Sequence, residues 1–151
     1  MSETLRLFTI GFTRKSAAVF FMTLRDAGVR HLVDIRLRNT SQMAGFTKRD
    51  DLDFFVHSIL GADYTHLPLL APSESILDAY QADHDWSNYE RDFQALLRMR
   101  KVGAALSPAD FVDACLMCSE PTADQCHRRL VAEHLRDVWR DAGLKVEIRH
   151  L

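Results

Sequence analysis

Short apolar segments alternate with segments of helical periodicity along the whole chain, and this alternation most constrains the fold. The apolar segments are expected to be strands, at residues 5–10, 31–36, 64–67, 115–118 and 146–150. Their cores are continuously apolar, which is typical of parallel strands buried on both faces. We therefore expect a three-layer α/β fold with a mostly parallel sheet of about five strands flanked by helices. The pattern also allows the strands at Tyr64 and Val146 to be antiparallel edges.

Capping residues and glycines mark where the helices begin and end. Ser16 is expected to cap a first helix that stops at Gly28, and Thr47 a second helix that stops at Gly61. Val19 and Ile59 are predicted on the inward faces of these two helices. Further helices or helical turns are expected at 73–81, at the capping box Ser87–Glu90, at Ser107–Asp110 and after Asp124.

Length and composition exclude several classes of protein. A chain of 151 residues, 47% of them hydrophobic and 26% charged, fits a single globular domain over residues 1–151. The net charge of -2 gives no global basic field for nucleic acid, although a local basic patch remains open. No segment approaches the apolar length of a membrane helix, and the N-terminus has no secretory pattern. Three cysteines without an export signal predict reduced thiols and a cytoplasmic location.

Polar residues follow several of the predicted strands, and this convergence predicts a site. In open parallel sheets, ligands bind outside the carboxyl ends of the strands, where helices begin. That rule collects residues from distant parts of the chain, of mixed charge: Gly11, Thr13, Asp34, Arg36, Ser41, His66, Cys118, Glu120, Cys126, His127 and Arg128.

The triplet Cys126-His127-Arg128 is the most distinctive part of this set. If Asp124 caps the helix, Cys126 lies in the first turn, where unpaired N–H groups and the helix dipole favour a thiolate or a bound anion. Arg128 adds a positive charge that lowers the pKa of such a thiol. The alternative is a small hydrophobic cysteine packed under the helix.

Asp34 and Arg36 stand within a buried apolar strand and share one face of it. An unpaired charge there is costly, so the two either form a mutual ion pair or are placed to hold a polar ligand. Farther along the chain, His84 and Trp86 are expected in a loop that covers a pocket, or Trp86 anchors the helix that follows.

Zinc is disfavoured by the spacing of its candidate ligands. Cys115 and Cys118 are three apart on a strand and face opposite sides, and the neighbours Cys126 and His127 seldom converge on one ion. Cys115 is expected in the core. No metal and no cofactor are therefore predicted.

The chain resembles an uncharacterised family, domain of unknown function 488, over nearly its whole length. The matching pieces are 9–16, 32–36, Ser41, 46–48, 64–70, 118–120, 126–128 and 146–150. Members usually carry histidine where Phe12 stands, and glycines where Ala71 and Pro72 stand. The resemblance implies an α/β domain with these motifs around one cleft, and it implies no established reaction.

Two functions are consistent with these residues. The first is an enzyme acting on a phosphate-bearing or otherwise anionic substrate, a nucleotide or nucleic acid among them. Cys126, His127, Asp34 and Glu120 would be its catalytic groups. The anion would be bound by Arg36, Arg128, Gly11, Thr13, Ser41 and His66. The alternative is a non-catalytic module that binds a nucleotide or nucleic acid in the same cleft. Either way, the expected partner is a small anionic ligand or a nucleic acid, not a membrane.

Overall fold

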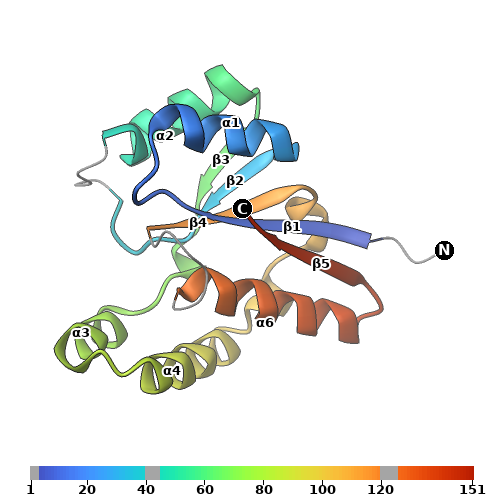
Figure 1. Cartoon of the computed structure of the whole chain (residues 1–151). Coiled ribbons are helices and arrows are strands. Elements are labelled where there is room, and N and C mark those ends of the chain that lie inside the picture. Colours follow the sequence, from blue (N-terminus) through green and yellow to red (C-terminus); the bar gives the residue numbers. More distant parts are fainter. Residues whose placement is uncertain (1–3, 40–44, 120–125) are drawn as a thin grey trace.

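Five parallel strands form the sheet at the centre of the molecule (Figure 1). The computed structural model describes residues 4–39, 45–119 and 126–151. The strands are β1 (Thr4–Gly11), β2 (His31–Asp34), β3 (Asp63–His66), β4 (Ala114–Cys118) and β5 (Lys145–His150), in the order β3-β2-β4-β1-β5. The edge strands are those that contain Tyr64 and Val146, but both pair in parallel, so the antiparallel option is wrong.

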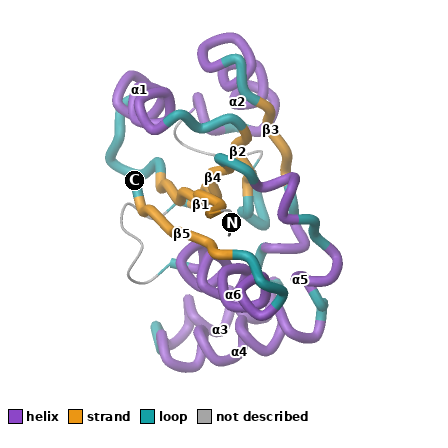
Figure 2. The backbone as a smooth tube through the Cα atoms, turned by 90° about the vertical axis from the view of Figure 1, so that its right-hand side faces the viewer, coloured by secondary structure: helices purple, strands orange, loops and turns teal. Residues whose placement is uncertain are grey.

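Helices cover both faces of the sheet and complete the three predicted layers (Figures 1 and 2). One face carries α1 (Ala17–Ala27), α2 (Arg49–Phe55) and the turn η2 (Val56–Leu60). The other carries α3 (Glu74–Asp83), α4 (Trp86–Met99), α5 (Val102–Ala105) and α6 (His127–Asp141). Short 3-10 turns lie at η1 (Gly45–Thr47), η3 (Pro68–Leu70) and η4 (Pro108–Phe111). None of the helices in the described part of the chain is long and apolar enough to cross a membrane.

Several helix boundaries follow the predicted caps and others do not. Ser16 accepts a hydrogen bond from the Val19 N–H, and Gly28 ends α1 with a φ of 77°, which glycine adopts without strain. Thr47 lies instead inside η1, and α2 begins after Lys48 without a side-chain cap. The predicted Ser87 cap is also wrong, because Asp85 caps α4 by accepting from the Asn88 N–H.

The sheet divides the core into two apolar clusters, one on each face. Residues that alternate along one strand belong to different clusters, as expected from the pleat. On β4, Leu116 and Cys118 pack on the α6 side, whereas Cys115 and Met117 pack on the α1 side. Val19 and Ile59 were predicted inward but are exposed, and Phe21 is buried in place of Val19. A helical period locates the apolar stripe only to within one neighbouring position.

The parallel register brings the ends of four strands to one edge of the sheet. Gly11 at the end of β1 is opposite Cys118 at the end of β4, and Asp34 of β2 is opposite both Met117 and His66. The chain segments that follow these strands therefore lie at the same edge, where α6 also begins.

Candidate functional site

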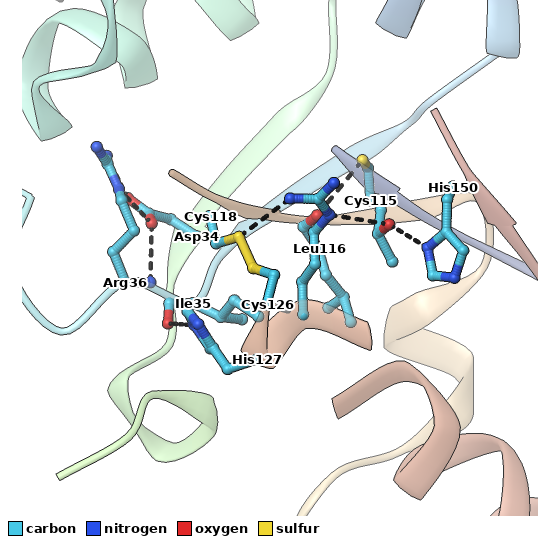
Figure 3. The surroundings of a disulfide bond; sticks show 11 residues. Asp34, Ile35, Arg36, Cys115, Leu116, Cys118, Cys126, His127 and His150 are labelled. Carbon is cyan, nitrogen blue, oxygen red and sulfur yellow. Dashed lines mark hydrogen bonds and ion pairs between the residues drawn. A yellow bond between two sulfur atoms is a disulfide. The ribbon is translucent and has the colours of Figure 1, made fainter. Parts of the chain in front are cut away.

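The predicted site residues fall into two groups on opposite faces of the sheet. Ile35 packs in the cluster on the α6 side. Asp34 and Arg36 directly precede and follow Ile35, so their side chains point to the other face, the α1 side. Cys118 and Cys126 belong to the cluster on the α6 side. Figure 3 shows the Arg36 guanidinium pointing away from the two sulfur atoms. The residues thus share one edge of the sheet, but they do not all line one cleft.

Asp34 is the centre of a buried hydrogen-bond network on the α1 face. Its carboxylate accepts from Arg36 Nε at 2.9 Å and Nη2 at 2.8 Å, so the two form a bidentate ion pair. Asn39 Nδ2 donates to the same carboxylate at 3.1 Å and the Tyr64 hydroxyl at 2.6 Å. Arg36 Nη2 also donates to the Thr47 carbonyl. The ion pair is therefore present, and partners within the chain saturate the carboxylate.

The electrostatics of this network keep Asp34 ionised. Burial alone would raise the pKa of the carboxyl group, but the hydrogen bond and the charge of Arg36 outweigh it and hold the pKa below its usual value. Burial, together with the hydrogen bond to Asp34, raises the pKa of Tyr64. Arg36 Nη1 is buried and has no hydrogen-bond partner among the described residues. In the network around Asp34, most polar atoms therefore have hydrogen-bond partners, and the network supports the edge of the sheet.

Cys126 directly precedes α6 as its N-cap residue, one step before the first turn in which it was predicted. Its side chain accepts no hydrogen bond from the helix. Its sulfur is instead joined to that of Cys118 in a disulfide, which corrects the expectation that all thiols are reduced (Figure 3). Asp124, which was predicted to cap this helix, lies outside the described residues. Cys126 is buried, with 2% of its surface exposed.

His127 is held by a backbone group of β2. Its Nε2 lies 2.8 Å from the Ile35 carbonyl oxygen, which can only accept, so Nε2 carries the proton and Nδ1 keeps a lone pair. Phe93 of α4 packs edge-on against the ring, with the centroids 5.7 Å apart. Burial lowers the pKa of His127 to about 4 despite its hydrogen bond to Ile35. The imidazole is therefore neutral at pH 7.

Arg128 brings a positive charge under the start of α6. Only 1% of it is exposed, and it donates from Nε to Thr9 Oγ1 at 3.2 Å and from Nη1 to Cys118 Sγ at 3.3 Å. Thr9 Oγ1 in turn lies 2.6 Å from His150 Nδ1 at the end of β5. Burial and the charge of Arg128 lower the pKa of Lys15. The positive charges of Arg128 and Lys15 therefore lie close enough to interact.

A cavity of about 150 Å³ opens beside the disulfide. One wall consists of residues from α3 and α4, namely Leu77, Tyr80, Trp86 and Tyr89. The other wall consists of residues at the end of β4 and the start of α6, namely Cys118, Ser119, Cys126 and His127. Trp86 and Tyr89 are stacked, with their ring centroids 5.0 Å apart and their planes at 18°. Trp86 lines this cavity, but it is the first residue of α4 rather than part of the predicted loop, and it also packs against the core, as the anchoring alternative expects. His84 is the C-cap of α3 and does not line this cavity.

The other predicted residues lie around the same edge. Gly11 is buried at the end of β1, and the N–H of the exposed Thr13 donates to the Ser119 carbonyl. His66 Nε2 bonds the Arg36 carbonyl at 2.8 Å, on the β3 side of the network. Ser41 and Glu120 lie outside the described residues.

Two features of this site were missed at the level of sequence. Cys118, Cys126 and His127 each offer a ligand atom, and these atoms lie within 4.8 Å of one another, although adjacent Cys and His were expected to diverge. The aromatic wall was also missed apart from Trp86. For the part of the wall on α4, the signal was the spacing of Trp86 and Tyr89, three apart on one helical face. Cys115 is buried on the opposite face, as predicted.

Comparison with known proteins gives one match. The family model described as "Domain of unknown function DUF488" matches residues 16–135, which is 120 of the 151 residues. No curated protein and no solved structure matches the chain.

Proposed function

The chain belongs to the DUF488 family of domains of unknown function, and we propose that it is an enzyme acting on a phosphate-bearing or otherwise anionic substrate. The substrate class is a nucleotide or the end of a nucleic acid. The site is the cavity between the aromatic residues of α3 and α4 and the start of α6.

The aromatic wall of this cavity carries the proposal. Tyr80 and Trp86 are partly exposed and meet a cavity whose opposite wall is Cys126 and His127. A nucleobase that stacks on such rings gains about 1–3 kcal/mol per base. An aromatic surface beside a helix N-terminus suits a ligand with a flat ring at one end and an anion at the other.

The charges around the cavity favour the anionic end of this ligand. The N-terminus of the 15-residue helix α6 provides the positive end of the helix dipole, and no side-chain oxygen or sulfur of the N-cap residue bonds the first turn. Arg128 and Lys15 add positive charge beneath and beside it. Arg128 and Arg36 are both buried, so they act through their field and by positioning neighbours rather than by direct contact.

Catalysis would follow reduction of the Cys118–Cys126 bond. Cys126 is then the nucleophile or the group that polarises the substrate, and His127, with its free Nδ1 lone pair, is the acid–base partner beside it. Asp34 is a positioning residue. It holds Arg36 by an ion pair and directly precedes Ile35, whose carbonyl group bonds His127. Glu120 stays a proposed acid or base by its place in the chain.

Ligand titration followed by isothermal titration calorimetry, which needs no tryptophan at the cavity, tests the proposal. The reduced chain is titrated with nucleoside monophosphates, with the matching nucleosides and with inorganic phosphate. We expect nucleotides to bind most tightly and Trp86→Ala to weaken them about 5- to 150-fold, which is the stacking energy expressed as a ratio. Arg140→Ala, an exposed charge at the far end of α6, is the control for non-specific anion binding. Equal binding by the parent and Trp86→Ala, or loss of binding in Arg140→Ala, contradicts the proposal.

A non-catalytic nucleotide-binding module is the second candidate, and the disulfide is the observation that favours it. With Cys126 joined to Cys118, no thiolate faces the cavity. Iodoacetamide alkylation of the reduced chain against pH separates the two. A Cys126 thiol that titrates below about 8.5 supports the enzyme, and one that titrates at or above this free value supports the binding module.

A further inference from the structure

The three donor atoms beside the cavity form a set that neither candidate function uses as a unit. The sulfurs of Cys118 and Cys126 and one imidazole nitrogen of His127 lie within 4.8 Å of one another. They come from the end of β4 and the start of α6, two elements that are in contact. All three residues also line the 150 Å³ cavity.

We propose that, when the Cys118–Cys126 pair is reduced, these two thiolates and the Nδ1 atom of His127 bind one Zn²⁺ ion. Thiolate and imidazole are the usual ligands of tetrahedral zinc sites. Zinc–ligand distances of about 2.3 Å to sulfur and 2.0–2.1 Å to nitrogen place tetrahedral ligands roughly 3.6–3.8 Å apart. Small side-chain movements convert the present cluster to that arrangement.

The backbone spacing suits an ion between the sulfurs. The Cα atoms of Cys118 and Cys126 are 7.7 Å apart, beyond the span of about 4.4–6.8 Å that is usual for disulfides. Reduction by a phosphine adds two electrons and two protons to the sulfurs, and the phosphine takes an oxygen atom from water to become its oxide. Zinc then displaces the remaining thiol protons, so binding releases two protons per ion at a pH where both thiols are protonated.

The surroundings prepare each ligand. The Ile35 carbonyl accepts the Nε2–H of His127, and a partner of this kind fixes the tautomer in which Nδ1 faces a metal. Arg128 Nη1 donates to Cys118 Sγ, which stabilises the thiolate form. Two thiolates balance the charge of one divalent ion, so the centre is neutral beside that guanidinium.

Three protein ligands leave a fourth position, and the cavity lined by all three ligands is on its open side. The ion would take over from the thiol the role of polarising the anionic group of a substrate. This use of the metal rests on the proposed function. Metal binding itself does not.

Cobalt and zinc titrations of the full chain test the site. The phosphine-reduced, desalted protein is titrated with Co²⁺ and then with Zn²⁺ under anaerobic conditions. We expect one ion per chain, the visible absorption of a tetrahedral cobalt thiolate, and loss of that absorption when zinc displaces cobalt. At a pH where both thiols are protonated, we also expect release of two protons per zinc. The oxidised protein, with its disulfide intact, should bind neither ion.

Substitutions decide which residues hold the ion. Cys118→Ser, Cys126→Ser and His127→Ala should each weaken zinc binding at least about 10-fold. Cys115→Ser, at a cysteine buried on the opposite face, is the matched control and should bind zinc as the parent does. Circular dichroism of each variant establishes that it is folded, and the proton count on the parent protein needs no variant.

The idea is overturned if the reduced parent shows no cobalt thiolate absorption, if zinc releases no protons, or if His127→Ala binds as tightly as the parent. Nucleotide titration of the metal-free reduced chain separates the two proposals. Nucleotide binding without any zinc binding supports the proposed function and refutes the metal site. Zinc binding without nucleotide binding, in either metal state, supports the metal site and refutes the proposed function.

Discussion

Removing the charge of Asp34 tests whether the buried network supports the sheet edge on which the site is built. The ion pair between Asp34 and Arg36 is 0% and 3% exposed, and the carboxylate also accepts from Asn39 and Tyr64. Asp34→Asn leaves the Arg36 guanidinium buried without a counter-charge and turns an amide donor toward other donors. Breaking one partner of a buried pair costs about 3–5 kcal/mol, which is a large part of a typical stability of about 5–15 kcal/mol.

Urea unfolding measures this loss. The control is Asp92→Asn, because the pair between Asp92 and Arg91 has a separation of 3.5 Å and exposures of 52% and 69%, so it should contribute less than about 1 kcal/mol. The double variant Asp34→Asn/Arg36→Met removes both charges and should be more stable than the sum of its single changes predicts. The coupling between the two sites then reports the pair itself.

The pH dependence of the same loss has a definite sign. The pKa of Asp34 is held below its unfolded value of about 3.9, so the unfolded chain takes up a proton first as the pH falls. The contribution of Asp34 is complete above about pH 4 and is lost as the pH falls through the native pKa. The stability gap between the parent and Asp34→Asn should therefore be constant near neutrality and shrink in acid. A loss no larger than that of Asp92→Asn, or a gap that widens in acid, refutes this reasoning.

Three further outcomes follow from single contacts. Tyr64→Phe removes the hydroxyl that donates to Asp34 and should cost about 1.5–3 kcal/mol in urea unfolding; an unchanged midpoint contradicts that hydrogen bond. Gly103→Ala places a methyl group against Val138 Cγ1, and Val138 Cβ at 3.0 Å keeps side-chain rotation from relieving it. It should lose about 1–3 kcal/mol in thermal or urea unfolding, rather than gain helix propensity. Burial raises the pKa of Cys115, so in the reduced native chain it should resist alkylation at pH 8 and react only on unfolding, as mass spectrometry of the labelled cysteines will show; rapid native labelling would contradict its burial.

The position of the site followed from sequence, but its division into two groups did not. Polar residues after several apolar strands can meet only at one edge of a parallel sheet, and Gly11, His66 and Cys118 do lie there. The set of polar residues collected from the sequence did not separate Asp34 and Arg36 from Cys126 and His127. Which face of the sheet a strand residue points to depends on how the alternation along the strand is aligned with the helix layers. Only packing decides that alignment.

Local signals determined the fold class and much of the helix pattern of this protein. The apolar strands and the ends of α1 at Ser16 and Gly28 could be predicted from neighbouring residues alone. Strand periodicity and helix caps are short-range effects. The tertiary structure alone decided the strand order, the parallel edges, the Cys118–Cys126 pairing and the aromatic wall at Trp86. The strand order, the parallel edges and the cavity wall opposite Cys126 join segments that are distant in the chain, and their energy comes from burying one segment against another. Cys118 and Cys126 are only eight residues apart, but β4 and the start of α6 must be in place before their sulfurs meet. That burial is absent until the whole sheet and both helix layers are assembled.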